Sequence, residues 1–357
     1  MAAKAASRAA GARLLAAFRE AGAVEVEADI LQPAEALLDL YGEDIRARAY
    51  VTSDPLRGEL MLRPDFTVPV VQAHMAGGAE PARYCYFGEV FRKQEHRSAR
   101  APEFFQVGYE VFDRADPEGA DAEVFALFSG LLAPLNLAAS IGDIGLLMDA
   151  VRGLDTLPAR RAALLRHIWR PARFQALLAR FAAPPAPSAA RVALLAGSAP
   201  RAHWVGLRSA ADMAARIAAL RADAAAPPLP ESAVAALAQL FAVSAPAPQA
   251  LAELEAIART MPAIAPAVAR LARRLAALAA RGVDLARVTY QASHGLGTME
   301  YYDGFVFSFA APTPGLPPVA SGGRYDALTA VLGQGRSIPA VGGVIRPGLV
   351  ADLEGAR

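Results

Sequence analysis

The sequence has only one cysteine among its 357 residues, and this scarcity limits what the protein could be. A single thiol excludes an intramolecular disulfide and any metal site built from several cysteines, and it is typical of a reducing compartment. Cys85 lies in the strand-like run RYCYFGEVF, where we expect a buried structural thiol and not a nucleophile. The sequence predicts no metal and no cofactor.

Long apolar segments and an excess of charge are also missing. No apolar run approaches the roughly 18 residues that span a bilayer, and 36 basic against 35 acidic side chains give a formal net charge of +1. Neither nucleic acid nor a membrane is therefore an expected partner. The absence of acidic residues before Glu20 resembles a transit peptide, but Leu14, Leu15 and Phe18 have near-helical spacing. We expect an ordinary first helix and a cytoplasmic protein.

The predicted secondary structure changes in character twice along the chain. Strand and helix patterns mix in residues 1–150, helical patterns fill residues 150–280, and strand signals return in residues 285–350. Strands on both sides of a helical block predict an α+β fold in which an antiparallel sheet is flanked by helices. We expect one domain with a core of residues 1–150 and 283–357 and a helical insertion of about 151–282.

Two pairs of strands are expected in the first zone. RARAYVTSD and GELMLRP are joined by the turn-prone DPLRG, and ARYCYFGEVFRK and FFQVGYEVFD flank a charged loop from Lys93 to Pro102. In the last zone, PPVASGGRYDALTAVLG predicts a strand, a turn at Gly322 and Gly323, and a helix.

The central zone is rich in alanine, leucine and arginine and is broken by proline-rich stretches such as APPAPS and APPLPES. LARRLAALAARG has the spacing of an amphipathic helix that ends at Gly282. We expect the arginines of this zone to form a solvated face. The alternative is a docking surface for another protein.

Polar residues that could bind a ligand cluster in the strand-like segments. Gln106 and Glu110 are an even number of residues apart, so they share one face of a strand. Asp65 and Glu110 could accept from cationic donors, and Arg92 could clamp a carboxylate or a phosphate. Because a buried carboxylate without a cation is costly, Glu110 either meets a cationic ligand or forms a structural ion pair with an arginine. For Arg92 the alternative is a surface side chain.

Three segments, taken in order, resemble the histidyl-tRNA synthetase family. They are LRPDFT, FRKQEHRSARAPEFFQ, and MEYYDGFVF with GGRYDAL, and the likeness runs from about Ala12 to Gly348. The resemblance implies the class II aminoacyl-tRNA synthetase catalytic fold, which is usually dimeric.

The resemblance also implies a histidine-binding pocket. LRPDFT matches the synthetase segment that helps to hold the amino group of histidine, and Arg92 matches the arginine that meets the α-phosphate of ATP and the amino-acid carboxylate. Gln106 and Glu110 match the histidine-binding pair, and the paired tyrosines lie near the imidazole. The expected binding residues are Asp65, Thr67, Arg92, Gln106, Glu110, Tyr301 and Tyr302.

Two positions depart from the synthetase pattern where catalysis needs positive charge. The synthetase RGLDYY reads GTMEYY here, so Gly297 replaces the arginine that stabilises the attack on ATP. Leu349 replaces the arginine that holds the γ-phosphate, and Pro347 is expected to break the helix pattern there. Loss of one such group commonly lowers the rate about 100–1000-fold. We therefore expect no catalytic residues and no aminoacylation.

The chain ends at Arg357, soon after the third motif, so no anticodon-binding domain is expected. Together with the two losses, this resembles the ATP phosphoribosyltransferase regulatory subunits, a family of synthetase paralogues. That resemblance implies a short-form catalytic subunit as partner, histidine as feedback effector in the first step of histidine biosynthesis, and a homodimer within a hetero-octamer.

Two other functions remain open at this point. One is a truncated enzyme that activates an amino acid with ATP, which Arg92, Arg97 and Arg100 would support. The other is a histidine-binding scaffold for an unrelated partner.

Overall fold

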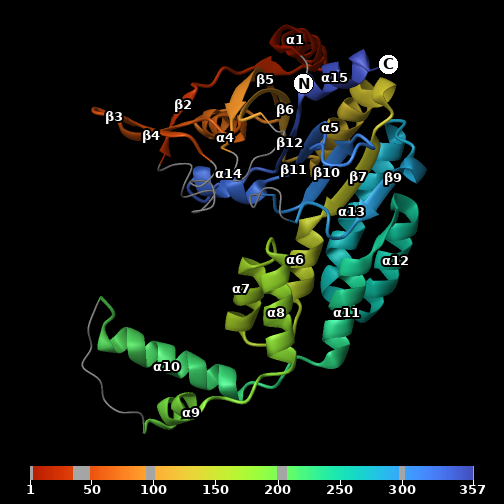
Figure 1. Cartoon of the computed structure of the whole chain (residues 1–357). Coiled ribbons are helices and arrows are strands. Elements are labelled where there is room, and N and C mark those ends of the chain that lie inside the picture. The colour runs from red at the N-terminus through yellow and green to blue at the C-terminus, as the bar shows by residue number, and fades with distance from the viewer. Residues whose placement is uncertain (1–2, 35–48, 94–100, 199–206, 297–301, 357) are drawn as a thin grey trace.

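A nine-stranded sheet forms the centre of the computed structural model (Figure 1). The structure describes residues 3–34, 49–93, 101–198, 207–296 and 302–356. The strands, in their spatial order, are β1 (Val24–Glu25), β5 (Ala82–Phe91), β6 (Glu103–Phe112), β12 (Ala340–Ile345), β11 (Ala320–Arg324), β10 (Phe305–Ala310), β7 (Ala138–Asp143), β9 (Val288–Gln291) and β8 (Ser244–Pro246). Only β1 with β5 and β7 with β9 are parallel pairs among these strands, so the sheet is mixed and mainly antiparallel.

Two apolar cores lie on opposite faces of this sheet. The larger one contains side chains of α1 (Lys4–Glu20), α5 (Pro117–Leu132) and α15 (Pro347–Gly355). The smaller one contains side chains of α4 (Thr67–Met75) and α14 (Asp326–Leu332). Alternation along β6 explains the separation, because Val107, Tyr109 and Val111 belong to the larger core whereas Gln106 and Glu110 face the other side.

Both predicted strand pairs of the first zone are confirmed. β3 (Val51–Asp54) and β4 (Gly58–Leu62) are antiparallel and form a small sheet with β2 (Leu31–Pro33). The Asp54 carboxylate accepts from the N–H groups of Leu56 and Arg57 and so closes the turn. β5 and β6 are the second pair, with Tyr84 opposite Glu110.

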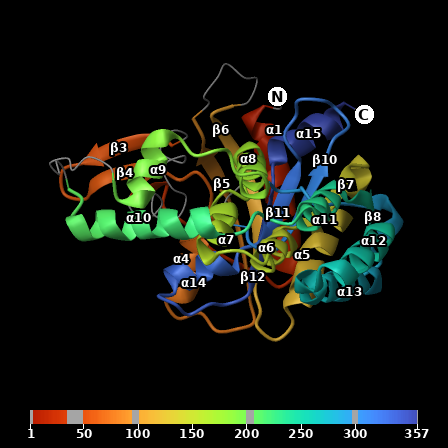
Figure 2. The same ribbon diagram turned by 90° about the horizontal axis from the view of Figure 1, so that it is seen from below.

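A helical segment connects β7 with β9. It contains α6 (Ile144–Arg152), α7 (Pro158–Arg166), α8 (Pro171–Ala182), α9 (Ala189–Ala196), α10 (Ala210–Ala225), α11 (Glu231–Ala242), α12 (Ala247–Thr260) and α13 (Ala265–Ala280). α13 lies along α5, and Gly282, at φ +80°, follows its end as expected. α9 and α10 project away from the body (Figure 1), and in the view from below they lie in front of the other elements (Figure 2). The division of the chain into a core and an insertion stays a prediction.

The turn predicted at Gly322 and Gly323 is wrong. Both residues lie inside β11 and pair with β10 and β12. Close packing of the strands explains the glycines, since a Cβ on Gly322 would overlap the carbonyl oxygen of Gly342. The chain turns after Arg324 and then enters α14.

The sequence predicts that Pro347 breaks a helix, and this prediction is wrong. Pro347 is the first residue of α15, where a missing N–H group costs no intrahelical hydrogen bond.

The predicted solvated arginine face is wrong at two positions of the helical segment. Arg160 and Arg274 are buried. Arg160 donates to the Asp223 carboxylate and to the carbonyl of Pro227, and so fastens α7 to the end of α10. Buried guanidinium groups are held by several partners, and residue type alone does not reveal those partners.

Candidate functional site

Glu110, Thr67, Tyr86 and Tyr325 form a buried polar cluster, the Glu110 cluster, on the side of the sheet covered by α4 and α14. The Glu110 side chain is only 1% exposed. The hydroxyl groups of Thr67 and Tyr86 donate to Oε1 at 3.2 and 2.9 Å, and the Tyr325 hydroxyl donates to Oε2 at 2.6 Å. Gly342, in the neighbouring strand β12, leaves the space that Oε2 occupies, because a Cβ there would overlap this oxygen.

The charge of Glu110 is not balanced by a cation within the described part of the chain. Burial raises the pKa of this carboxyl to about 7; the three hydroxyl donors oppose the rise, and the Asp65 carboxylate adds to it. None of the described arginines or lysines forms an ion pair with Glu110, so the structural ion pair considered from the sequence is not seen there. The cluster can therefore either hold a proton or accept a cationic group.

Gln106 lies on the same strand face as Glu110, as the alternation predicted. It is fully buried, and neither its Nε2 nor its Oε1 has a hydrogen-bond partner among the described residues. A buried amide without partners is unusual and costs free energy that a bound ligand can recover. This side chain is therefore the clearest sign of a ligand-binding position in the described structure.

The segment before α4 brings the other acidic group close. Asp65 is buried, and its Oδ1 accepts from the backbone N–H of Thr67 at 3.2 Å. Thr67 is the first residue of α4 and also reaches Glu110. Asp65, Thr67 and Glu110 are thus brought together from two elements.

Arg92 lies just after β5 and is held against the same segment. Its Nε donates to the carbonyl of Pro64 at 3.0 Å, and its guanidinium lies 5.8 Å from the ring centroid of Phe104. Arg92 is therefore positioned beside the cluster by backbone and aromatic contacts, and it is not a freely solvated side chain.

Tyr302 is half-buried and packs against the smaller core, which also contains Tyr325. Tyr301, Gly297, Arg97 and Arg100 lie outside the described residues, so the expectations for them are not tested. Leu349 lies in α15 and packs against the larger apolar core.

Sequence reasoning did not assign Tyr86, Tyr325 or Gly342 to the site. The register places Tyr86 opposite Gly108, and a Cβ on Gly108 would overlap the Tyr86 ring. A glycine facing a tyrosine across a predicted strand pair was therefore an available signal for Tyr86. Tyr325 is 215 residues from Glu110, and no local pattern indicates that contact.

Two further observations concern only the described residues. No group of three or more His, Cys, Asp or Glu side chains there could hold a metal ion. No helix there combines the length and the apolar character that crossing a membrane requires.

The chain is similar in sequence to two related kinds of protein. A sequence model described as histidyl-tRNA synthetase matches residues 2–347. A protein from Agrobacterium fabrum named ATP phosphoribosyltransferase regulatory subunit is 35% identical, with 92% of each chain covered. A protein of the same name from Mesorhizobium japonicum is also 35% identical, again with 92% of each chain covered.

Solved structures show the same architecture. An ATP phosphoribosyltransferase regulatory subunit/histidyl-tRNA synthetase from Bacillus halodurans has a TM-score of 0.69 at 20% identity, over 98% of this chain and 79% of that one. A histidine–tRNA ligase subunit from Alicyclobacillus acidocaldarius has a TM-score of 0.61 at 22% identity, over 99% and 94%. The expected class II synthetase-like α+β fold is confirmed.

Proposed function

We propose, from the premise that this chain belongs to the ATP phosphoribosyltransferase regulatory subunit family and has the histidyl-tRNA synthetase fold, that it senses histidine at the Glu110 cluster. Bound histidine inhibits a short-form ATP phosphoribosyltransferase catalytic subunit, which needs this chain for activity in the first step of L-histidine biosynthesis. The two subunits work in the cytoplasm as a hetero-octamer that contains homodimers of this chain.

The single observation that carries this proposal is a buried carboxylate without a counter-ion beside a buried amide without hydrogen bonds, on one face of β6 among the described residues. Glu110 has hydroxyl donors but no cation, and the buried amide of Gln106 has no partner among the described residues. Histidine carries an ammonium and an imidazole, which supply a positive charge and both donor and acceptor nitrogens. Asp65, Thr67, Arg92 and Tyr302 would complete the contacts, together with Tyr301.

The same site has little means of performing catalysis. The position that holds the γ-phosphate in synthetases is Leu349, which packs in the apolar core. Without a positive charge at this position, the transition state loses one of its stabilising contacts. A site that binds histidine without activating it fits a regulatory role.

Replacement of Glu110 tests the proposed site. We expect Glu110→Ala to abolish histidine inhibition of the reconstituted complex, because the cationic group of the effector loses its counter-charge. Glu103→Ala is the matched control, since Glu103 begins the same strand but pairs with Lys4 at the surface. Inhibition curves and size-exclusion chromatography would measure both variants. A Glu110→Ala complex that assembles and is still fully inhibited would refute the assignment.

A second candidate function is favoured by the held position of Arg92 beside the Asp65 segment. A truncated synthetase-like enzyme would use this arginine on the α-phosphate of ATP. Histidine-dependent ATP–pyrophosphate exchange distinguishes the two functions. We expect no exchange above background, and exchange that Arg92→Ala removes would favour the enzyme.

A further inference from the structure

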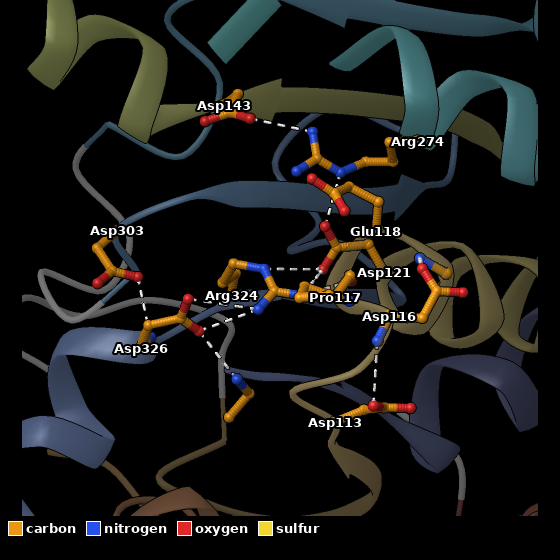
Figure 3. Close-up of polar contacts among 12 residues, drawn as sticks. Asp113, Asp116, Pro117, Glu118, Asp121, Asp143, Arg274, Asp303, Arg324 and Asp326 are labelled. Carbon is orange, nitrogen blue, oxygen red and sulfur yellow. Dashed lines mark hydrogen bonds and ion pairs between the residues drawn. The ribbon is translucent and has the colours of Figure 1, made fainter. Parts of the chain in front are cut away.

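A continuous chain of ion pairs, buried except at Asp326, runs between the sheet and the helical segment (Figure 3). Arg274 of α13 donates from Nε to Oδ2 of Asp121 at 2.7 Å and from Nη1 to Asp143 at 3.0 Å. Arg324 of β11 donates from Nη2 to the other oxygen of Asp121 at 2.7 Å and from Nη1 to Asp326 at 3.0 Å. We call Asp143, Arg274, Asp121, Arg324 and Asp326 the ion-pair chain.

The middle of the ion-pair chain is sealed from water. Asp121 is 0% exposed, and Arg274 and Asp143 are each 2% exposed. Loss of one partner leaves a buried charge uncompensated, which is strongly destabilising, so a shift of one member favours a matching shift of its neighbours. Asp121 accepts from Arg274 with one carboxylate oxygen and from Arg324 with the other, so it connects the two arginines.

One end of the ion-pair chain adjoins the Glu110 cluster. Arg324 is the last residue of β11, and its side chain lies on the α5 face of the sheet, where it donates to Asp121. The next residue, Tyr325, lies in the core on the opposite face and donates its hydroxyl to Glu110. Arg324 and Tyr325 thus connect the two faces of the sheet through one peptide bond.

The segment that contains Tyr302 is hydrogen-bonded to the same part of the sheet. Asp303 follows Tyr302, and its backbone N–H donates to the carbonyl of Arg324 at 3.0 Å. The Asp303 carboxylate accepts from the N–H groups of Asp326 and Ala327, the first two residues of α14. Tyr325 is thus covalently bonded to Arg324, and Tyr302 is bonded to Asp303, whose N–H group donates to Arg324.

The other end of the ion-pair chain holds the base of the helical segment at two points. Asp143 ends β7 and caps α6, where its Oδ1 accepts from the N–H of Leu146 at 3.2 Å. Arg274 lies in α13, by which the segment returns to the sheet. α6, which leaves the sheet, and α13, which returns to it, are therefore held by Asp143 and Arg274, two adjacent members of the ion-pair chain.

We propose that the ion-pair chain couples the Glu110 cluster to helices α6 and α13, with Arg324 and Arg274 as positioning residues. A ligand that displaces Tyr325 moves Arg324, and the shared carboxylate of Asp121 passes that displacement to Arg274 and to the base of the helical segment. This inference rests on the proposed function, since it explains how bound histidine changes a distant surface. Coupling of this kind requires a connected element that both sites bias, and buried charges supply one.

A double variant breaks the connection without leaving an excess charge. Arg274→Met with Asp143→Asn removes one positive and one negative group, and it leaves the Arg324–Asp121 pair intact. Asparagine also keeps the cap of α6. Arg273→Met is the matched control, because Arg273 is the adjacent residue of α13 and pairs with Glu118 of the same helix α5, but at the surface (59% exposed). Arg274→Lys is a second variant, since an ammonium is a poor bridge between two carboxylates.

Two quantities are measured for each variant: the histidine dissociation constant of the regulatory subunit by calorimetry, and the histidine inhibition constant of the reconstituted complex. We expect the double variant to bind histidine within about threefold of the wild type while its inhibition constant rises tenfold or more, as a coupling of ordinary size allows. Arg274→Lys should change in the same direction, and Arg273→Met should behave as the wild type.

Unchanged inhibition in the folded double variant, or in Arg274→Lys if the double variant does not fold, overturns the coupling but not histidine sensing. Failure of the wild-type subunit to bind histidine at all overturns both. An equal loss of inhibition in Arg273→Met also contradicts the proposal, because α13 would then act through its surface.

Discussion

Three hydroxyl groups surround Glu110 where an ordinary buried carboxylate would have a guanidinium. Burial and the Glu110 carboxylate both raise the pKa values of Tyr86 and Tyr325, so these hydroxyls remain donors. Hydroxyl donors orient a carboxylate but leave its charge in place. A carboxyl group with a pKa of about 7 therefore gains most from a ligand that brings a positive charge.

The raised pKa of Glu110 leads to a prediction about stability. In the folded state this pKa is about 7, above the ordinary value of 4.5. Between these values the folded protein binds more protons than the unfolded chain, so stability falls as pH rises through that window and changes no further above it. Glu110→Gln removes this dependence. We expect its free energy of unfolding, relative to the wild type, to rise by roughly 2–3 kcal/mol between pH 5 and pH 8.

Urea unfolding of both proteins at the two pH values measures this difference. Glu103→Gln serves as the control, because Glu103 is a surface partner of Lys4. Parallel pH dependences of the wild type and Glu110→Gln would show that Glu110 is ionised throughout this range, contrary to our interpretation.

At the scale of elements, close strand packing makes the space for the site. β12 runs antiparallel to β6 with Gly342 opposite Glu110, and β5 places Tyr86 opposite Gly108. The two glycines let a carboxylate and a tyrosine ring occupy volume that side chains would otherwise fill. The site therefore depends on the missing side chains of Gly342 and Gly108 as well as on the Glu110 side chain of β6.

Gly342→Ala should disturb the site through this packing. A Cβ at this position would overlap Oε2 of Glu110 and approach the carbonyl oxygen of Tyr109 at 3.0 Å. We expect a loss of about 1–3 kcal/mol in unfolding free energy and a large loss of histidine affinity, measured by thermal denaturation and calorimetry. Gly130→Ala is the control, because nothing lies within 4 Å of its Cβ in α5, and it should stabilise by up to about 1 kcal/mol. Equal histidine affinities of Gly342→Ala and the wild type would contradict this view of the strand.

Local patterns predicted the elements whose signals are local. Alternation placed Gln106 and Glu110 on one strand face, the DPLRG turn joined β3 to β4, and the charged loop separated β5 from β6. A glycine pair favours a turn by local pattern, but at Gly322 and Gly323 the reason for the glycines is the close approach of β12. The burial of Arg160 and Arg274 was also missed, since residue type favours the surface and only tertiary partners reverse it.

The contacts that complete the site come from distant parts of the chain. Tyr325 meets Glu110 across 215 residues, and Arg274 meets Asp121 across 153. Such contacts follow from sheet order, and sheet order is not encoded in the spacing of neighbouring residues. Resemblance and alternation thus indicate Gln106 and Glu110 as candidate binding positions, and they indicate neither the hydroxyl partners of Glu110 nor the ion-pair chain.

At the scale of the whole molecule, the sheet separates two regions with different expected tasks. The Glu110 cluster lies on the side of α4 and α14, and the helices of α5 and α13 lie on the other (Figure 1). Residues 324 and 325 belong to both sides, because Arg324 joins Asp121 while Tyr325 joins Glu110. In the proposed coupling, these two residues are where a change at the Glu110 cluster reaches the α5 side of the sheet.

The most direct test of this account is the rate of phosphoribosyl-ATP formation by a short-form catalytic subunit from the same source. The rate is measured for that subunit alone, after addition of this protein, and after further addition of histidine. We expect this protein to raise the rate and histidine to reverse the increase. A rate that stays the same after addition of this protein, with or without histidine, would contradict the regulatory function.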